Sequence, residues 1–184
     1  MALATATQLS ISIPSCTPGI GDVILATDSP RLISGVQVSL YPIWPDDRGY
    51  FLEVLRIGQG LTSGFDPYST QISAALTYPG AIKAFHYHKD QTDLWVACQG
   101  MFQVGLVDLR PDSPTFGIKN TMYIGSLRPW QVLIPPGVGH GYKVLGVDPA
   151  MLVYATNRFY NPQDEGRIAY DHPEIRYDWE LQHK

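Results

Sequence analysis

The spacing of two histidines in residues 80–100, GAIKAFHYHKDQTDLWVACQG, constrains the fold of this chain more than any other feature. One residue separates His86 from His88, so in a β-strand both side chains point to the same face of the sheet. Asp93 follows in the same segment. A second segment, IPPGVGHGY, ends an apolar run with a Pro-Pro-Gly turn signal and places His140 just beyond it. Three histidines and an acid are therefore expected to converge.

Turn residues divide the chain into short extended segments. The 17 glycines and 15 prolines punctuate it throughout, and no long segment has the 3.6-residue period of an amphipathic helix. This pattern predicts an all-β, antiparallel jelly roll whose two sheets turn alternate residues into one cavity. The expected strands are 35–41, 50–56, 71–76, 81–86, 94–98, 102–108, 122–125, 131–134 and 150–155.

The length and the ends of the chain suggest its domain organisation. A chain of 184 residues is long enough for one domain with a conventional buried core. We expect this domain to span residues 31–172, with an N-terminal arm, 1–30, and a C-terminal tail, 173–184, peripheral to it.

Charge and cysteine content limit the partners and the location. The formal net charge of -4 gives no general attraction to nucleic acid or to anionic membranes, so an anionic substrate must be held by local cations. No segment approaches the ~20 apolar residues of a membrane span, and the start lacks the basic region of a signal peptide. Cys16 and Cys98 form no disulfide framework. We therefore expect a cytoplasmic protein without a nucleic-acid or membrane partner.

The two histidine segments resemble the two cupin motifs, with Asp93 where the pattern has a glutamate. Further matches between about residues 34 and 171 narrow the resemblance to the dTDP-4-dehydrorhamnose 3,5-epimerase family. They are DDRGYF (46–51), KAFHYH (83–88), VDLRPDSPTFG (107–117), IPPGVGHGY (134–142) and YATN (154–157). The resemblance implies a cupin jelly-roll barrel, a double-stranded β-helix, that assembles as a homodimer.

The resemblance also implies an isomerase that moves protons next to the ketone of a dTDP-4-keto-6-deoxy sugar. His86 matches the family's base, and an imidazole that titrates near pH ~6.5 is mostly neutral at neutral pH. Tyr154 matches the tyrosine that returns a proton from the opposite face of the sugar. The alternative for each residue is structural, since a strand histidine or tyrosine commonly fills the core and finds a polar partner there.

Further positions match substrate contacts of the family. Arg48 matches an arginine that holds the nucleotide diphosphate, a task for which the fork of guanidinium donors is suited, although a solvated turn cation is the alternative. Lys83 replaces a family arginine and keeps its charge. The other positions that match substrate contacts are Glu53, Gln71, Ser73, His140, Tyr160 and Glu165.

Asp93 departs from the family, which has a lysine there to stabilise the oxygen that becomes negative when the proton leaves. An aspartate has the wrong sign for that task. The family's C-terminal aspartate, which hydrogen-bonds the catalytic histidine, also has no match, and Asp171 and Asp178 are the nearby candidates to replace it.

Two arrangements would account for Asp93. One is a divalent metal (Zn, Fe, Ni or Mn) held by His86, His88, Asp93 and His140, which would prevent His86 from acting as a base. The other is a metal-free site in which Asp93 orients His86 or His88 by a hydrogen bond. The wider resemblance favours the metal-free site with no cofactor. A metal-dependent cupin enzyme and a catalytically silent sugar-nucleotide-binding cupin remain the alternative functions.

Overall fold

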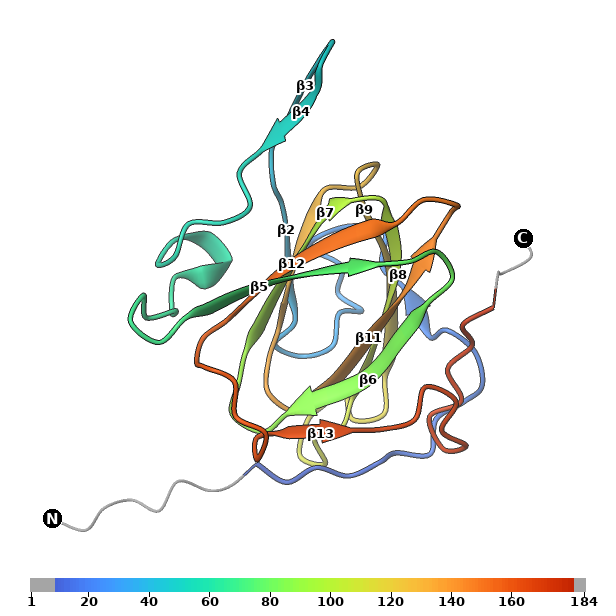
Figure 1. The fold of residues 1–184 in the computed structure, drawn as a ribbon. Helices are drawn as coiled ribbons and strands as arrows, with labels where there is room; N and C mark the ends of the chain where they lie inside the picture. Colours follow the sequence, from blue (N-terminus) through green and yellow to red (C-terminus); the bar gives the residue numbers. More distant parts are fainter. Residues whose placement is uncertain (1–8, 181–184) are drawn as a thin grey trace, which may run out of the picture.

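The computed structural model describes residues 9–180, and their regular secondary structure consists almost entirely of β-strands (Figure 1). A six-stranded sheet has the order β1-β9-β8-β11-β6-β13, and a five-stranded sheet has the order β2-β10-β7-β12-β5. The first sheet comprises β1 (Asp22–Val23), β6 (Ile82–His88), β8 (Met101–Asp108), β9 (Lys119–Gly125), β11 (Val138–Leu145) and β13 (Glu165–Arg167). The second comprises β2 (Gln37–Leu40), β5 (Gln71–Thr77), β7 (Asp93–Gln99), β10 (Trp130–Ile134) and β12 (Ala150–Thr156).

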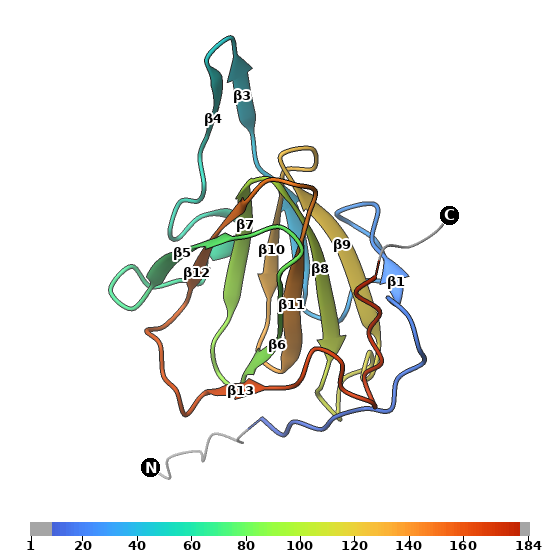
Figure 2. The same cartoon turned by 45° about the vertical axis from the view of Figure 1, so that its right-hand side comes forward.

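The two sheets pack face to face, and their inner faces form the main core (Figure 2). Period-two alternation assigns each strand residue to a face. In β7, Trp95 and Ala97 point into this core, whereas Leu94 and Val96 belong to a separate cluster outside the five-stranded sheet. The expected all-β jelly-roll barrel is confirmed. None of the helices in the described part of the chain is long and apolar enough to cross a membrane.

Strand β11 was not among the strands expected from the sequence, which indicated only the Pro-Pro-Gly turn before His140. The chain is extended from Val138 to Leu145, with glycines on both sides of His140, and pairs with both β6 and β8. The missing side chains permit close packing, since a Cβ on Gly141 would lie 2.3 Å from the Cβ of Ala84. Gly141 therefore allows β11 to pack closely against β6 and does not form a turn.

A hairpin of β3 (Ile43–Asp46) and β4 (Gly49–Leu52) projects from the barrel (Figures 1 and 2). The sequence predicted a longer strand over 50–56, but regular pairing ends at Leu52. A short 3-10 helix, η1 (Gly60–Thr62), follows before β5. The hairpin exposes large apolar side chains, with Trp44 51% and Phe51 68% accessible.

The N-terminal arm and the C-terminal tail contribute more to the fold than their expected peripheral position suggested. Strand β1 pairs in parallel with β9, and Ile24 is fully buried in the main core. At the other end, Ile175, Tyr177 and Trp179 are buried against the outer face of the six-stranded sheet. Residues 1–8 and 181–184 lie outside the described part of the chain.

The tail covers the face of β6 that points away from the cavity. Phe85 alternates with His86 along the strand, and its ring centroid lies 5.4 Å from that of Trp179 and 5.7 Å from that of Tyr177. Gly105 allows this approach, because a Cβ there would lie 2.7 Å from the Tyr177 ring. The tail therefore holds the strand that carries two of the clustered histidines.

We expect Trp179→Ala to lower the free energy of unfolding by about 3 to 5 kcal/mol, because it removes a buried indole that packs on Phe85. Urea denaturation followed by circular dichroism measures the change. Leu25→Ala, at a residue 66% accessible, is the control and should alter stability by less than about 0.5 kcal/mol. Equal denaturation midpoints for the two variants would show that the tail does not stabilise the barrel.

Candidate active site

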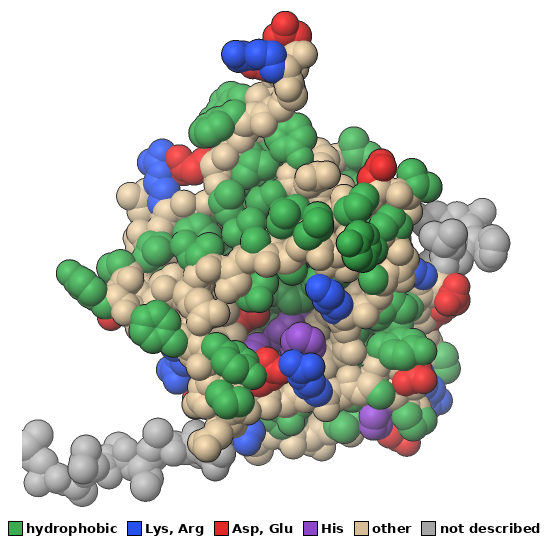
Figure 3. Space-filling model, in the orientation of Figure 1, with side chains coloured by type: hydrophobic (Ala, Val, Ile, Leu, Met, Phe, Trp, Pro, Cys, Tyr) green, Lys and Arg blue, Asp and Glu red, His purple; other side chains and the backbone are tan. Residues whose placement is uncertain are grey.

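A cavity of about 360 Å³ opens between the two sheets, and histidine side chains lie at the bottom of the hollow (Figure 3). Its volume is at the small end of the usual range for ligand pockets. Most of the lining side chains carry a polar or ionisable group. The lining consists of Gln71, Ala75, Lys83, His86, His88, Gln91, Asp93, Trp95, His140, Tyr142, Leu152, Tyr154, Thr156, Tyr160, Glu165 and Arg167.

Strand register explains how residues far apart in the sequence meet here. In the six-stranded sheet, His86 is paired with His140 on one side and with Arg167 on the other. In the five-stranded sheet, Thr156 is paired with Asp93. Because paired residues present their side chains to the same face, each sheet contributes a continuous polar strip to the cavity.

His140 presents an unprotonated ring nitrogen to the cavity. Its Nδ1 lies 2.9 Å from the carbonyl oxygen of Val138, which can only accept, so Nδ1 carries the hydrogen and donates. Burial lowers the pKa of His140 to about 4, against the opposing effect of Asp93. The lone pair on Nε2 therefore faces Asp93, whose Oδ2 is 3.7 Å away.

Gln91 fixes the orientation of His88 and Asp93. Its amide nitrogen donates to Asp93 Oδ1 at 2.7 Å and to His88 Nε2 at 3.2 Å. His88 must accept this bond, so its Nε2 also carries a lone pair. Trp95 Nε1 donates to the second oxygen of Asp93 at 3.3 Å. His88 Nε2 is 3.9 Å from Asp93 Oδ1, so the direct hydrogen bond between His88 and Asp93 that was considered from the sequence does not form.

Asp164 holds the turn that carries Gln91. Its carboxylate accepts backbone N–H bonds from Lys89 at 2.9 Å, Asp90 at 2.7 Å and Gln91 at 3.1 Å. Its Oδ2 also lies 4.0 Å from His88 Nδ1, the nitrogen that carries the hydrogen. The buried carboxylate of Asp164 thus positions Gln91 and His88, the two residues beside the Asp93 side chain.

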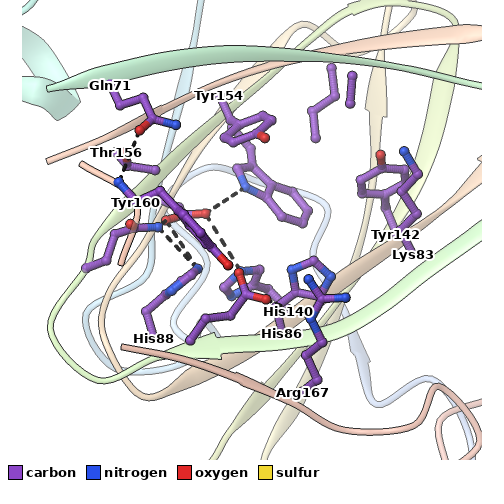
Figure 4. Close-up of a pocket in the computed structure, with 16 residues that line it drawn as sticks. Gln71, Lys83, His86, His88, His140, Tyr142, Tyr154, Thr156, Tyr160 and Arg167 are labelled. Atoms are coloured by element: carbon purple, nitrogen blue, oxygen red, sulfur yellow. Dashed lines mark hydrogen bonds and ion pairs between the residues drawn. The ribbon is translucent and has the colours of Figure 1, made fainter. Parts of the chain in front are cut away.

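His86 lies apart from this group and is only half-buried. Its ring centroid is 6.0 Å from that of His140 (Figure 4). Burial is the main cause that lowers its pKa, while Glu165 raises it. Glu165 and Arg167 form an ion pair with a separation of 2.7 Å at the cavity edge.

Tyr154 reaches the cavity from the opposite sheet. It lies on β12, whereas His86 lies on β6, and Figure 4 shows the two side chains on opposite sides of the cavity. Tyr160 extends between them, and its backbone N–H donates to Gln71 Oε1 at 3.1 Å. A molecule bound here would have an imidazole on one side and a phenol on the other.

Most residues predicted for the site line the cavity, but three do not. His86, His88, Asp93 and His140 come together as expected, with Gln71, Lys83, Tyr154, Tyr160 and Glu165 around them. Arg48 lies on the projecting hairpin, where it pairs with Asp46. Glu53 pairs with Arg56 in a second hollow, and Ser73 accepts a bond from Gln71 without lining the cavity.

Several lining residues were not predicted from the sequence. Gln91 and Trp95 flank Asp93 at two-residue intervals, Thr156 follows Tyr154 by two, and Arg167 follows Glu165 by two. Extending the strand period from each predicted residue would have found them. The C-terminal candidates Asp171 and Asp178 do not line the cavity.

Three of the four proposed metal ligands form a compact donor group. His88, Asp93 and His140 are all buried, and each offers a ligand atom within 4.8 Å of the others. His86 is outside this group. The four-residue ligand set considered from the sequence therefore reduces to three, and His86 is separate from them.

The two-sheet barrel and the cavity between its sheets define the fold as that of a cupin. Residues 31–184 match the model of the dTDP-4-dehydrorhamnose 3,5-epimerase family. The chain belongs to this family, whose members are isomerases that act on nucleotide sugars. The resemblance inferred from the motifs is confirmed.

Two of the similar proteins have names that refer to polysaccharide or glycan biosynthesis. The spore coat polysaccharide biosynthesis protein SpsL of Bacillus subtilis is 45% identical, over 80% of this chain and 97% of that protein. The probable low-salt glycan biosynthesis epimerase Agl13 of Haloferax volcanii is 36% identical, over 80% of this chain and 94% of that protein.

Solved structures of family members share the fold. The dTDP sugar isomerase of Desulfovibrio desulfuricans superposes with a TM-score of 0.73 at 27% identity, over 80% of this chain and 92% of its own. The Legionella pneumophila epimerase in complex with dTDP-4-keto-L-rhamnose gives a TM-score of 0.68 at 28% identity, over 80% of this chain and 79% of its own.

We expect Asp164→Ala to lower the free energy of unfolding by about 2 to 4 kcal/mol, because it leaves three backbone donors without their carboxylate. Asp164→Asn should lose less, since its one carbonyl oxygen still accepts from Lys89 and Asp90. Asp90→Ala, which removes an exposed carboxylate from the same turn, is the control. Chemical denaturation of the four proteins tests this order, and a loss in Asp90→Ala equal to that in Asp164→Ala would contradict it.

Proposed function

We propose that this protein epimerises a dTDP-4-keto-6-deoxy sugar by removing and returning the proton on a carbon next to the ketone. The observation that carries the proposal is the placement of His86 and Tyr154 on opposite sides of one cavity. A proton that leaves from one face of a planar intermediate and returns to the other inverts the carbon. Family membership and the sugar nucleotide bound by the Legionella enzyme support this substrate class.

His86 acts as the base in this scheme. Its imidazole takes the proton from the carbon, and the electron pair of the broken C–H bond moves to the ketone oxygen, giving an enolate. The Tyr154 hydroxyl then donates its proton to the opposite face of the same carbon as the carbonyl re-forms. Exchange with solvent returns both side chains to their starting protonation states.

The charges around the cavity suit an anionic, sugar-containing ligand. Lys83 and Arg167 both line it, and Lys83 Nζ lies 6.0 Å from the Tyr142 ring centroid. A volume of about 360 Å³ accommodates a sugar ring within the cavity, with the diphosphate at the charged rim. We propose that these two cations bind the diphosphate.

A homodimer forms part of this proposal. Strand β5 is an edge of the five-stranded sheet, and edge strands with exposed apolar side chains favour association. Hydrophobic side chains gather over β5 and the base of the hairpin (Figure 3). We call the exposed apolar side chains of β5, its C-terminal end and the hairpin the apolar patch: Phe51, Ile72, Leu76 and Tyr78. Arg48 and Glu53 do not line the cavity of their own chain, so we propose that any role for them in substrate binding requires a second chain.

We also propose a cytoplasmic location, which the two free thiols support. Cys16 is buried and Cys98 is partly buried, and burial raises the pKa of both thiols. Such thiols are protected from oxidation and are ordinary in a reducing compartment.

The epimerase proposal predicts that His86→Asn loses solvent exchange at the sugar by about 10²- to 10⁴-fold, since the base is removed. Proton NMR of a dTDP-4-keto-6-deoxy sugar in heavy water measures the exchange, and calorimetry should show nucleotide binding within a few-fold of wild type. His172→Asn, outside the cavity, is the matched control. Exchange at the wild-type rate in His86→Asn would remove this residue from the mechanism.

Tyr154→Phe should separate abstraction from inversion. Without the phenol the base still removes the proton, so deuterium enters with retained configuration while the epimeric product falls by about 10²-fold or more. The same NMR experiment distinguishes these products. Wild-type protein that binds the nucleotide sugar without any deuterium incorporation would favour the catalytically silent binding protein instead.

The dimer proposal predicts that Leu76→Asp yields a monomer at micromolar concentration, because it places a charge in the apolar patch. Leu25→Asp substitutes an exposed leucine beside β1, on the other sheet, and should remain dimeric. Sedimentation equilibrium measures both. A monomeric wild type would refute the dimer.

A further inference from the structure

We propose that His88, Asp93 and His140 form a binding site for one divalent transition-metal ion, and that His86 is not a ligand. The inference deepens the proposed function, on which its catalytic meaning rests. It also removes the conflict between the two arrangements considered from the sequence, because the metal and the base use different histidines. The donor set of two imidazoles and one carboxylate suits zinc or ferrous iron.

The directions of the lone pairs carry this proposal. His140 uses its Nδ1 hydrogen on Val138 O, and His88 accepts from Gln91 at Nε2, so both Nε2 atoms face inward as acceptors. Asp93 adds two carboxylate oxygens, at 3.9 Å from His88 Nε2 and 3.7 Å from His140 Nε2. Acceptors that face one another at this range repel unless a positive centre lies between them.

The separations are close to those of a metal site. Two ligands that are each ~2.1 Å from one ion lie roughly 3 to 3.5 Å apart. The observed 3.7 and 3.9 Å between Asp93 and the two histidines exceed this by a few tenths of an ångström, and the three ligand atoms all lie within 4.8 Å of one another, so binding an ion requires rotations of the side chains toward it. All three side chains are at least nine-tenths buried, with 6%, 4% and 2% of His88, Asp93 and His140 accessible.

In this structure, the amide N–H groups of Gln91 provide partial positive charge to the cluster of His88, Asp93 and His140. Its amide nitrogen lies between Asp93 and His88 and donates to both. Only rotation of the terminal amide is needed to turn its oxygen, in place of its nitrogen, toward the three donors. Oε1 would then be available as a fourth oxygen or nitrogen donor.

The outer contacts of the three donors also match a metal site. Ligating histidines commonly donate their second ring nitrogen to a carbonyl or a carboxylate. His140 donates to Val138 O, and His88 Nδ1 faces Asp164 Oδ2 at 4.0 Å. Trp95 Nε1 holds the second oxygen of Asp93. Each of the three metal-binding side chains is thus oriented by a neighbouring polar group of the protein.

A cation at this position would compensate for the negative charge that Asp93 brings to the cavity. Where the family resemblance implies a lysine, the cavity has a carboxylate, and a divalent ion would restore positive charge to the same region and polarise a carbonyl oxygen. His86, on the same wall of the cavity, keeps its imidazole free to accept the proton from carbon. The ion and the base then act on neighbouring atoms of the ketone.

Cobalt titration of tag-free protein, stripped of metal by a chelator, tests the site. Wild type and His86→Asn should each bind one equivalent and develop visible ligand-field absorption. His88→Ala, Asp93→Ala and His140→Ala should bind about 100-fold more weakly or not at all. Metal should also raise the melting temperature of wild type and of His86→Asn, but not that of the three ligand variants. A metal stabilises a protein only when it binds the folded state more tightly than the unfolded state. Circular dichroism confirms that each variant is folded.

Less than one-tenth of an equivalent of cobalt or zinc on folded wild type overturns the metal site, and so does loss of binding in His86→Asn. Solvent exchange at the sugar is measured on the same samples, so the two proposals fail separately. If solvent exchange at the sugar persists in protein that cannot bind metal, the epimerase proposal holds and a catalytic role for the ion is refuted. Metal bound at one equivalent without exchange would support the site and refute the epimerase.

Discussion

The register of β11 against β6 is the constraint on which the cavity depends. It places His140 opposite His86, while the absence of a side chain at Gly141 lets the two strands approach within contact of Ala84. A slip of one residue would turn every one of these side chains to the outer face, where Phe85 now packs under the tail. The packing of Tyr177 and Trp179 on that outer face thus fixes which residues face inward.

A polar group as buried as His88, Asp93 and His140 is stable only because neighbouring residues satisfy it. Gln91 and Trp95 donate to Asp93, and Asp164 holds the turn from which Gln91 extends. The cavity therefore has two chemically distinct regions. One is the enclosed donor group, and the other is the more open space between His86 and Tyr154.

Local periodicity predicted the residues whose chemistry depends on a single strand. The alternation of His86 and His88, and the turn before His140, were sufficient to place them in one cavity. The tail was harder to predict because Ile175, Tyr177 and Trp179 gain their burial from Phe85 and Gly105, far away in the chain. For Arg48, the motif match carried no information about the direction in which its hairpin projects.

The order of strands in the two sheets has a consequence for the kinetics of folding. Within residues 9–180, nearly every neighbouring pair joins segments distant in sequence, as in β1 with β9, β2 with β10, and β6 with β13, and only β8–β9 and β3–β4 are simple hairpins. Chains of such high contact order must close long loops before the pairing compensates for the lost entropy, and they commonly fold in milliseconds to seconds. The side chains of the cavity come from β6, β7, β11 and β12, which are joined mainly by such long-range pairings. We therefore expect the cavity to form only when the barrel closes, not within a local unit that folds first.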